Sequence, residues 1–165
     1  IYNVDSLIQG GIAPGLADDI VRRKNGIELK RLELQDHATR DGYIGTQRYL
    51  DELDEINRAD ISLREELGDQ RYDEFLYNSK QNNRVRIASV MLGSPAELAG
   101  LEKNDIVLSY DNKRVFEWQE LKDATAQGAL GEYVSLSVYR DGEIYSFSVP
   151  RGTLGVQLGA TRLAP

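Results

Sequence analysis

The stretch Gly93-Ser-Pro-Ala-Glu-Leu-Ala-Gly-Leu101, followed by Asn104-Asp-Ile-Val-Leu108, decides the fold of the C-terminal half of this chain. Ser94 is placed to cap a short helical turn, because its side chain can accept a hydrogen bond from an amide at the start of the helix. Pro95 suits the first helical position, where no amide donor is needed. Gly100 favours the end of that turn, and an aspartate then precedes an apolar run. The pattern predicts a helical turn that leads into a buried strand.

On both sides of this stretch the sequence is rich in β-forming residues. The expected strands cover residues 85–90, 106–110, 133–139 and 145–149. Asp111-Asn112 and Asp141-Gly142 are expected to form tight turns, because both pairs tolerate the positive φ that a short hairpin requires. One helix over residues 117–127 separates the strands. These elements predict a small, partly open β-barrel with two helices.

The N-terminal half has helical periodicity instead, from about residue 15 to residue 80. The segment that contains Tyr49, Leu50, Leu53 and Ile56 has the spacing of one helix face. An earlier amphipathic segment is expected to be interrupted or kinked at Asn25-Gly26. Asp60 is expected to cap a short helix over residues 61–67. The helices are predicted to form a hairpin or a short coiled segment that packs on the C-terminal half or on a partner chain.

These patterns predict an α+β protein with two domains. Residues 1–82 form the helical region, and residues 83–165 form the partly open barrel. The chain begins at Ile1 rather than at a methionine, so a longer parent protein with an upstream anchor or signal is expected.

The quoted stretch resembles the signature GSPA..AGL…GD.IL of bacterial PDZ domains, which occur in HtrA-type, C-terminal processing and site-2 proteases. Asn104 stands where the family usually has glycine, and asparagine also tolerates left-handed backbone geometry. The lead-in over residues 67–77 resembles the helical region of other bacterial PDZ-containing proteins. The resemblance implies that an extended peptide adds to a sheet edge, with its terminal carboxylate held by backbone amides.

The resemblance also implies a circularly permuted strand order, in which the carboxylate loop lies near the C-terminus. In that order Thr153-Leu-Gly-Val156 is the loop, Arg151 supports the carboxylate, and residues 156–161 form the strand that pairs with the ligand. The helix 117–127 forms the opposite wall. If Leu121 and Ala124 face the core, Trp118, Lys122 and Thr125 line the groove. The candidate peptide-binding residues are Arg151, Gly152, Thr153, Leu154, Gly155, Val156, Gln157, Leu158, Trp118, Leu121, Lys122 and Thr125.

Several classes of function lack the residues they need. The net charge of −7 and the pI near 4.8 argue against nucleic acid and against an anionic membrane surface. The chain has no cysteine and one histidine, so no thiolate or zinc site is expected. His37 lies among helical charges and is expected at the surface. No nucleophile elbow of the form G-x-S-x-G is present. We therefore expect no enzyme activity, no metal and no cofactor.

The expected function is recognition of protein or peptide C-termini, with a preference for hydrophobic ones, in the bacterial cell envelope. The helical half is a possible homodimer interface, and any membrane contact is expected through a segment outside these residues. Two alternatives stay open. In the first alternative, the chain is a regulatory or substrate-recognition part of a larger envelope protease. In the second, it is a packing and oligomerisation domain that binds no peptide, and its groove is occupied by the helical half or by its own tail, residues 160–165.

Overall fold

The computed structural model describes residues 3–165 of the 165-residue chain. The chain forms two compact units that meet between Ser79 and Lys80, a few residues before the boundary expected from the sequence. The first unit is helical, and the second is a sheet with two helices. The α+β class is therefore confirmed. Within the described residues, no helix is both long enough and apolar enough to cross a bilayer.

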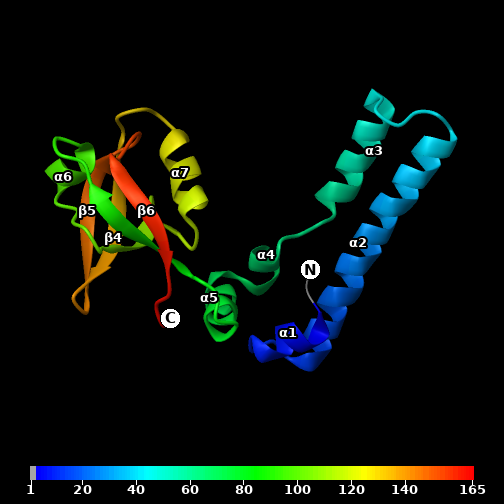
Figure 1. The fold of residues 1–165 in the computed structure, drawn as a ribbon, viewed down its shortest axis with the longest axis horizontal. Coiled ribbons are helices and arrows are strands. Elements are labelled where there is room, and N and C mark those ends of the chain that lie inside the picture. The colour runs from blue at the N-terminus through cyan, green and yellow to red at the C-terminus, as the bar shows by residue number, and fades with distance from the viewer. Residues whose placement is uncertain (1–2) are drawn as a thin grey trace. The chain divides into compact units, whose positions relative to one another are not determined.

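The described residues of the N-terminal unit form five helices (Figure 1). They are α1 (Val4–Gln9), α2 (Pro14–Arg40), α3 (Gln47–Arg58), α4 (Leu63–Leu67) and α5 (Asp69–Asn78). Helix α2 continues through Asn25-Gly26 without a break, so the expected interruption there is wrong. A single glycine costs a helix about 1 kcal/mol, which the other residues of a long helix can offset.

Helices α2 and α3 lie side by side as an antiparallel hairpin (Figure 1). The buried residues of α2 are Ala17, Ile20 and Ala38, all near its two ends. Helix α3 has no buried residue. The core of the unit instead gathers residues from α1, α4, α5 and the start of α2, among them Leu7, Ile20, Leu63 and Phe75. The middle of the hairpin therefore contributes little to the core of its own unit.

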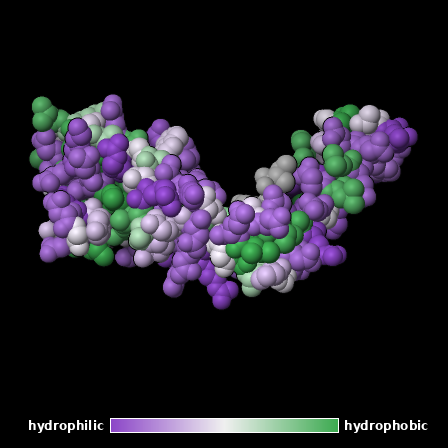
Figure 2. All heavy atoms as spheres, turned by 60° about the horizontal axis from the view of Figure 1, so that its bottom comes forward, coloured by the Kyte–Doolittle hydropathy of each residue, from purple (hydrophilic) through white to green (hydrophobic). Residues whose placement is uncertain are grey.

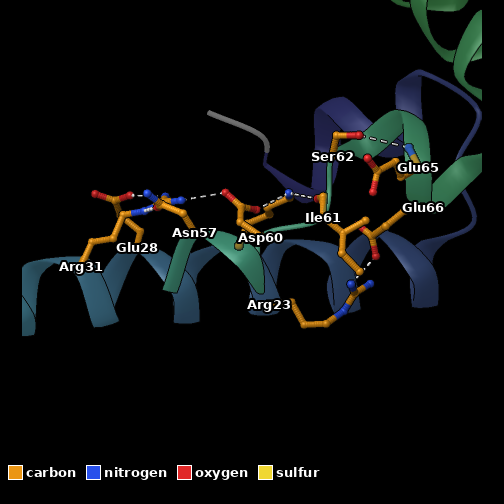
Figure 3. Close-up of polar contacts among 10 residues, drawn as sticks. Arg23, Glu28, Arg31, Asn57, Asp60, Ile61, Ser62, Glu65 and Glu66 are labelled. Atoms are coloured by element: carbon orange, nitrogen blue, oxygen red, sulfur yellow. Dashed lines mark hydrogen bonds and ion pairs between the residues drawn. The ribbon is translucent and has the colours of Figure 1, made fainter. Parts of the chain in front are cut away.

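Asp60 joins the segment after α3 to α2, and it is not the helix cap that the sequence predicted. Its carboxylate accepts hydrogen bonds from Lys24 Nζ at 2.7 Å and from Arg31 Nη2 at 2.9 Å. The cap of α4 is Ser62, whose Oγ accepts from the amide of Glu65 at 3.2 Å (Figure 3). Two long cationic side chains attract the carboxylate more strongly than one backbone amide does, which explains the difference.

We expect acid to weaken the helical unit through Asp60. The hydrogen bonds from Lys24 and Arg31 lower the pKa of the Asp60 carboxyl below its usual value. A carboxyl whose folded pKa is lowered stabilises the fold above its unfolded pKa, and this contribution is lost as pH falls through the folded pKa. The change Asp60→Asn is expected to cost about 1 to 2 kcal/mol at neutral pH and to reduce the loss of stability below about pH 4.

Thermal unfolding followed by far-ultraviolet circular dichroism at a series of pH values measures this effect. The matched control is Asp54→Asn, because Asp54 pairs with Arg58 one turn along an exposed helix face, where a pair contributes little. If the Asp60→Asn protein keeps the acid sensitivity of the wild type, Asp60 is not its source.

The C-terminal unit is an antiparallel sheet with two helices. Its elements are β1 (Arg84–Val90), α6 (Pro95–Ala99), β2 (Ile106–Tyr110), β3 (Lys113–Arg114), α7 (Trp118–Ala126), β4 (Tyr133–Arg140), β5 (Glu143–Pro150) and β6 (Val156–Thr161). The strands follow the order β5-β4-β2-β1-β6, with β3 paired to β2. The last strand of the chain therefore lies at an edge of the sheet, next to the first, and α7 stands beside it (Figure 1).

The expected turns and caps of this unit are confirmed. Asp111 and Asn112 both have positive φ and join β2 to β3, and Asp141 and Gly142 do the same between β4 and β5. Asn104 also has a positive φ, of 75°. Ser94 Oγ accepts from the amide of Glu97, as expected of a helix cap. Local residue chemistry is thus sufficient to explain these turns.

An ion pair with a buried carboxylate joins two segments of this unit. The carboxylate of Asp105, which is only 1% exposed, receives Arg140 Nε and Nη2, each at 2.7 Å. Asp105 also accepts from the amide of Glu102 at 2.9 Å, and Arg140 donates to the carbonyl of Gly100 at 3.0 Å. The pair therefore fastens the end of β4 to the segment between α6 and β2.

Candidate functional site

A groove of about 710 Å³ lies between β6 and α7. Its lining is mostly apolar, and Lys122 is the only charged residue in it. The residues that line it are Ala88, Met91, Trp118, Leu121, Lys122, Thr125, Thr153, Leu154, Gly155, Val156, Gln157 and Leu158. The volume and the apolar lining are those of a binding site for a small ligand or a short segment of chain.

One wall of the groove is an open strand edge. In an antiparallel ladder, facing residues alternate between pairs that exchange hydrogen bonds and pairs whose backbone groups point away from each other. Val156 faces Val90, and the next pair along exchanges a bond from the amide of Met91 to the carbonyl of Gly155, at 2.9 Å. The N–H and C=O of Val156 therefore point away from β1.

The same holds for Leu158, which faces Ile87. The amide of Ile87 donates to the carbonyl of Asp105, and its carbonyl accepts from the amide of Asn104, each at 2.8 Å. Because Ile87 uses both backbone groups on the β2 side, it exchanges none with Leu158. Val156 and Leu158 thus offer alternate donors and acceptors along the free edge, as an added antiparallel strand requires.

The loop before β6 directs further amides away from the sheet. The carbonyl of Leu154 accepts from the amide of Ala96 at 3.0 Å, and the carbonyl of Gly155 accepts from Met91. No peptide bond of the described residues is cis, so each following N–H points opposite to its carbonyl. The amides of Gly155 and Val156 therefore point away from the residues that hold the loop. The amide of Gly155 has no backbone acceptor in the described part of the chain, and that of Val156 points away from β1, the only strand beside β6 in the described sheet.

Gly155 is the residue that makes this loop possible. Its φ is +79°, which turns its amide out of the direction of a regular strand and which L side chains rarely adopt. A Cβ at this position would also lie 2.4 Å from the Cβ of Ser94. The loop therefore rests directly on the cap of α6, so the two sequence motifs are parts of one structure.

Helix α7 forms the other wall. Leu121 is 1% exposed and belongs to the core cluster, with Ala124 packed against that cluster. Trp118, Lys122 and Thr125 line the groove at i, i+4 and i+7 spacing. Lys122 Nζ lies 5.7 Å from the centre of the Trp118 ring, an arrangement of a cation over an aromatic face. Ten of the twelve candidate residues line one groove.

Arg151 and Gly152 do not line it. The sequence assigned Arg151 to the ligand carboxylate, but its side chain is only 9% exposed and is used within the protein. Nη1 donates to the carbonyl of Ala124 at 3.0 Å, and Nη2 pairs with Asp111 at 2.6 Å. The hydrogen bond to Asp111 raises the pKa of the Arg151 guanidinium above its usual range. A helix carbonyl and a carboxylate already bind Nη1 and Nη2 of this cation, while its buried Nε has no hydrogen-bond partner in the described part of the chain.

The sequence missed two lining residues, Ala88 and Met91, which lie at the end of β1 and just after it. The available signal was the permuted strand order itself, because a last strand paired with the first brings residues of β1 into the groove.

The C-terminal tail, residues 160–165, lies outside the groove. Asn83 Nδ2 donates to the carbonyl of Leu163 at 2.8 Å, and the amide of Leu163 donates back to Asn83 at 2.9 Å. No tail residue lines the groove in the described chain.

The described residues contain no group of side chains able to hold a metal ion. His37 lies on the surface of α2, where its Nε2 is 3.1 Å from Oδ2 of Asp41.

A family model described as PDZ domain matches residues 51–150. This range starts within α3 and stops before β6, so it includes helical residues outside the sheet unit and omits the loop and strand of the groove. Among solved structures, the HtrA3 PDZ domain bound to a phage-derived ligand (FGRWV) is similar at 16% identity and a TM-score of 0.35. That likeness covers 48% of this chain and 86% of the other.

Two curated relatives are serine proteases by name. A probable periplasmic serine endoprotease DegP-like of Hahella chejuensis is 31% identical over 78 residues, which cover 47% of this chain and 17% of the relative. A serine protease Do-like HtrA of Bacillus subtilis is 35% identical over 69 residues, which cover 41% of this chain and 15% of the relative. The matched part is thus a small share of each relative's length.

Proposed function

This chain belongs to the PDZ domain family, and on that premise we propose that its C-terminal unit binds the C-termini of partner proteins by strand addition. The predicted resemblance to bacterial PDZ domains of the HtrA type is confirmed by the family match and by the DegP-like and HtrA relatives. A PDZ domain is a protein-interaction module, so the proposed role of the unit is recognition and not catalysis.

One observation carries the proposal: two adjacent amides, of Gly155 and Val156, lie unused at the end of an open strand edge. The edge lets a peptide continue the sheet antiparallel to β6, and the amides supply donors where its carboxylate would end. Hydrogen bonds to a charged acceptor are roughly twice as strong as those between neutral groups.

The groove lining points to the chemistry of the ligand. The last side chain of a bound peptide would meet Leu154, Val156 and Leu158 together with the apolar part of α7. We therefore propose a hydrophobic terminal residue. Arg151 is already paired, so the carboxylate depends on backbone amides, with Lys122 as the only cation of the lining. Affinities for strand addition of this kind are expected to be about micromolar.

A library of random heptapeptides with free C-termini tests this proposal on the full chain. Each peptide that is enriched is then synthesised as the free acid and as the C-terminal amide. We expect enrichment of apolar terminal residues and an affinity at least about tenfold lower for the amide. Equal affinity of the two forms would show that the carboxylate is not recognised, and an absence of enriched peptides would remove peptide binding altogether.

We propose the bacterial cell envelope as the place of action, because the DegP-like relatives are named as periplasmic. The relatives being proteases also supports the alternative that this unit selects substrates for a larger envelope protease. Both roles use the same groove and the same ligand chemistry.

We further propose that the helical unit pairs with a second copy of this chain through the outer face of α2. Leu29 and Leu32 are each 55% exposed on that face. The pairs Asp18–Arg22 and Asp36–Arg40 lie toward its two ends. An antiparallel second α2 centred on Leu29 brings Arg22 level with Asp36 of the second copy, and Asp18 level with Arg40. On the face of the hairpin that Figure 2 shows, hydrophobic residues are scattered among hydrophilic ones.

Sedimentation equilibrium over a range of concentrations tests this pairing. The wild type is expected to show a dimer, and Leu29→Lys is expected to give a monomer, because it places two like charges at the two-fold axis. Leu98→Lys is the control, since Leu98 is 82% exposed on a helix of the other unit. A monomeric wild type at every concentration contradicts the proposal, as does a Leu29→Lys protein that still dimerises.

A further inference from the structure

Arg151 occupies a position from which it can control the width of the groove. It lies directly after β5 and two residues before the loop that begins at Thr153. Its backbone is fixed on both sides, because its amide donates to the carbonyl of Glu132 at 2.6 Å and its carbonyl accepts from Gly131 at 2.9 Å. The side chain therefore extends from a rigid point of the sheet.

The two arms of the guanidinium, Nη1 and Nη2, bind separate elements. One arm binds the carbonyl of Ala124 in the last turn of α7, and the other binds Asp111 in the turn between β2 and β3. A cation is favourable at the C-terminus of a helix, where the last carbonyls lack partners and the helix dipole is negative. Thr125, the residue after Ala124, lines the groove. The contact thus lies one residue away from the groove lining.

The surroundings leave the side chain little freedom. A Cβ at residue 128 would lie 2.7 Å from Arg151 Nε, so only glycine allows the guanidinium to pass there. The guanidinium also lies 5.8 Å from the centre of the buried Tyr110 ring. The second arm cannot move toward the groove without breaking the pair with Asp111. Arg151 is therefore held in one position by contacts from several segments.

We propose that Arg151 is a positioning residue that ties the C-terminal turn of α7 to the start of the carboxylate loop and so sets the distance between the two walls of the groove. It acts through Ala124 and does not touch the ligand. This inference rests on the proposed function for its effect on binding. The tether itself is a property of the free protein and can be measured without a ligand.

The experiment compares Arg151→Lys with Arg140→Lys in the full chain. Both replacements keep the charge and remove one arm of a guanidinium that pairs with an aspartate, but Arg140 binds Asp105 and Gly100 and reaches neither α7 nor the loop. Hydrogen exchange of the α7 amides is measured first, without ligand. We expect exchange of the last turn of α7 to rise about tenfold or more in Arg151→Lys and to stay at the wild-type rate in Arg140→Lys.

Binding is measured next, with a fluorescein-labelled heptapeptide that has a free C-terminal leucine and was enriched from the library. Arg151→Lys is expected to weaken binding by about tenfold, mainly through faster dissociation, while Arg140→Lys leaves the affinity of the folded fraction unchanged. Unchanged α7 exchange in Arg151→Lys overturns the tether. Equal losses of affinity in the two variants overturn the positioning role. A wild type that binds no peptide removes the proposed function, and the exchange result still decides the tether.

Discussion

Replacing Arg140 by methionine is expected to destabilise the PDZ unit by about 3 to 5 kcal/mol, the cost of leaving a buried charge without its partner. Asp105 is almost fully buried and receives both arms of the arginine. The hydrogen bonds between Arg140 and Asp105 raise the pKa of the Arg140 guanidinium above its usual range, which is consistent with strong mutual stabilisation of the two charges. After the change, the carboxylate keeps only the amide of Glu102 as a donor.

Urea unfolding followed by the fluorescence of Trp118 reports on this unit, because Trp118 is the only tryptophan of the chain. The double variant Arg140→Met/Asp105→Asn is expected to recover at least about half of the loss, since asparagine carries no charge and still accepts from Glu102. Arg86→Met is the control, because the side chain of Arg86 makes an exposed hydrogen bond to Asn104, and the effect of the change is expected to stay within about 0.5 kcal/mol. A single variant as stable as that control would falsify the structural role of the pair.

Replacing Gly155 by alanine is expected to remove peptide binding and to destabilise the unit by about 3 kcal/mol. Two costs add: a left-handed backbone at a residue with a Cβ, about 1 kcal/mol, and a Cβ placed 2.4 Å from that of Ser94, for which overpacking values of about 1 to 3 kcal/mol apply. Relief of the contact requires the loop to leave α6. The amides of Gly155 and Val156 then no longer point toward the proposed position of the ligand carboxylate.

The matched control is Gly142→Ala. Its φ of +84° is close to that of Gly155, but a Cβ there meets no atom within 4 Å. We therefore expect the backbone cost of about 1 kcal/mol alone, with peptide affinity unchanged. Equal losses of stability in the two variants, measured by urea unfolding, would show that the contact with Ser94 is unimportant. Retained affinity in Gly155→Ala would show that the loop does not hold the carboxylate.

The residues that the sequence interpreted correctly are those whose partners lie close in the chain. Ser94 caps the turn that begins one residue later, and Asp111, Asn112 and Asn104 adopt positive φ because their own side chains tolerate it. Such features are local, so they can be predicted without knowing what surrounds them. The walls of the groove were also predicted, because the resemblance to bacterial PDZ domains carried the strand order with it.

The misassigned residues are charged ones with several possible partners. From the sequence, Asp60 could cap α4 or pair with a cation. In the structure it pairs with Lys24 and Arg31, about thirty residues earlier in the chain. Arg151 could face a ligand or the protein, and in the structure its guanidinium binds Asp111 and the carbonyl of Ala124. Long-range charge pairing depends on distances that only the folded chain sets, and no spacing in the sequence reports them.

By itself, the sequence determined the α+β class, the turns of the sheet unit, the caps of α6 and the family, because each follows from the conformational preferences of neighbouring residues or from a local motif. The tertiary structure alone decided the partner of Asp105, the use of Arg151 within the protein, and the direction of the amides of Gly155 and Val156. That direction depends on carbonyls held by Met91 and Ala96, about sixty residues earlier in the chain. Only the packing of the loop on α6 and β1 brings these groups together.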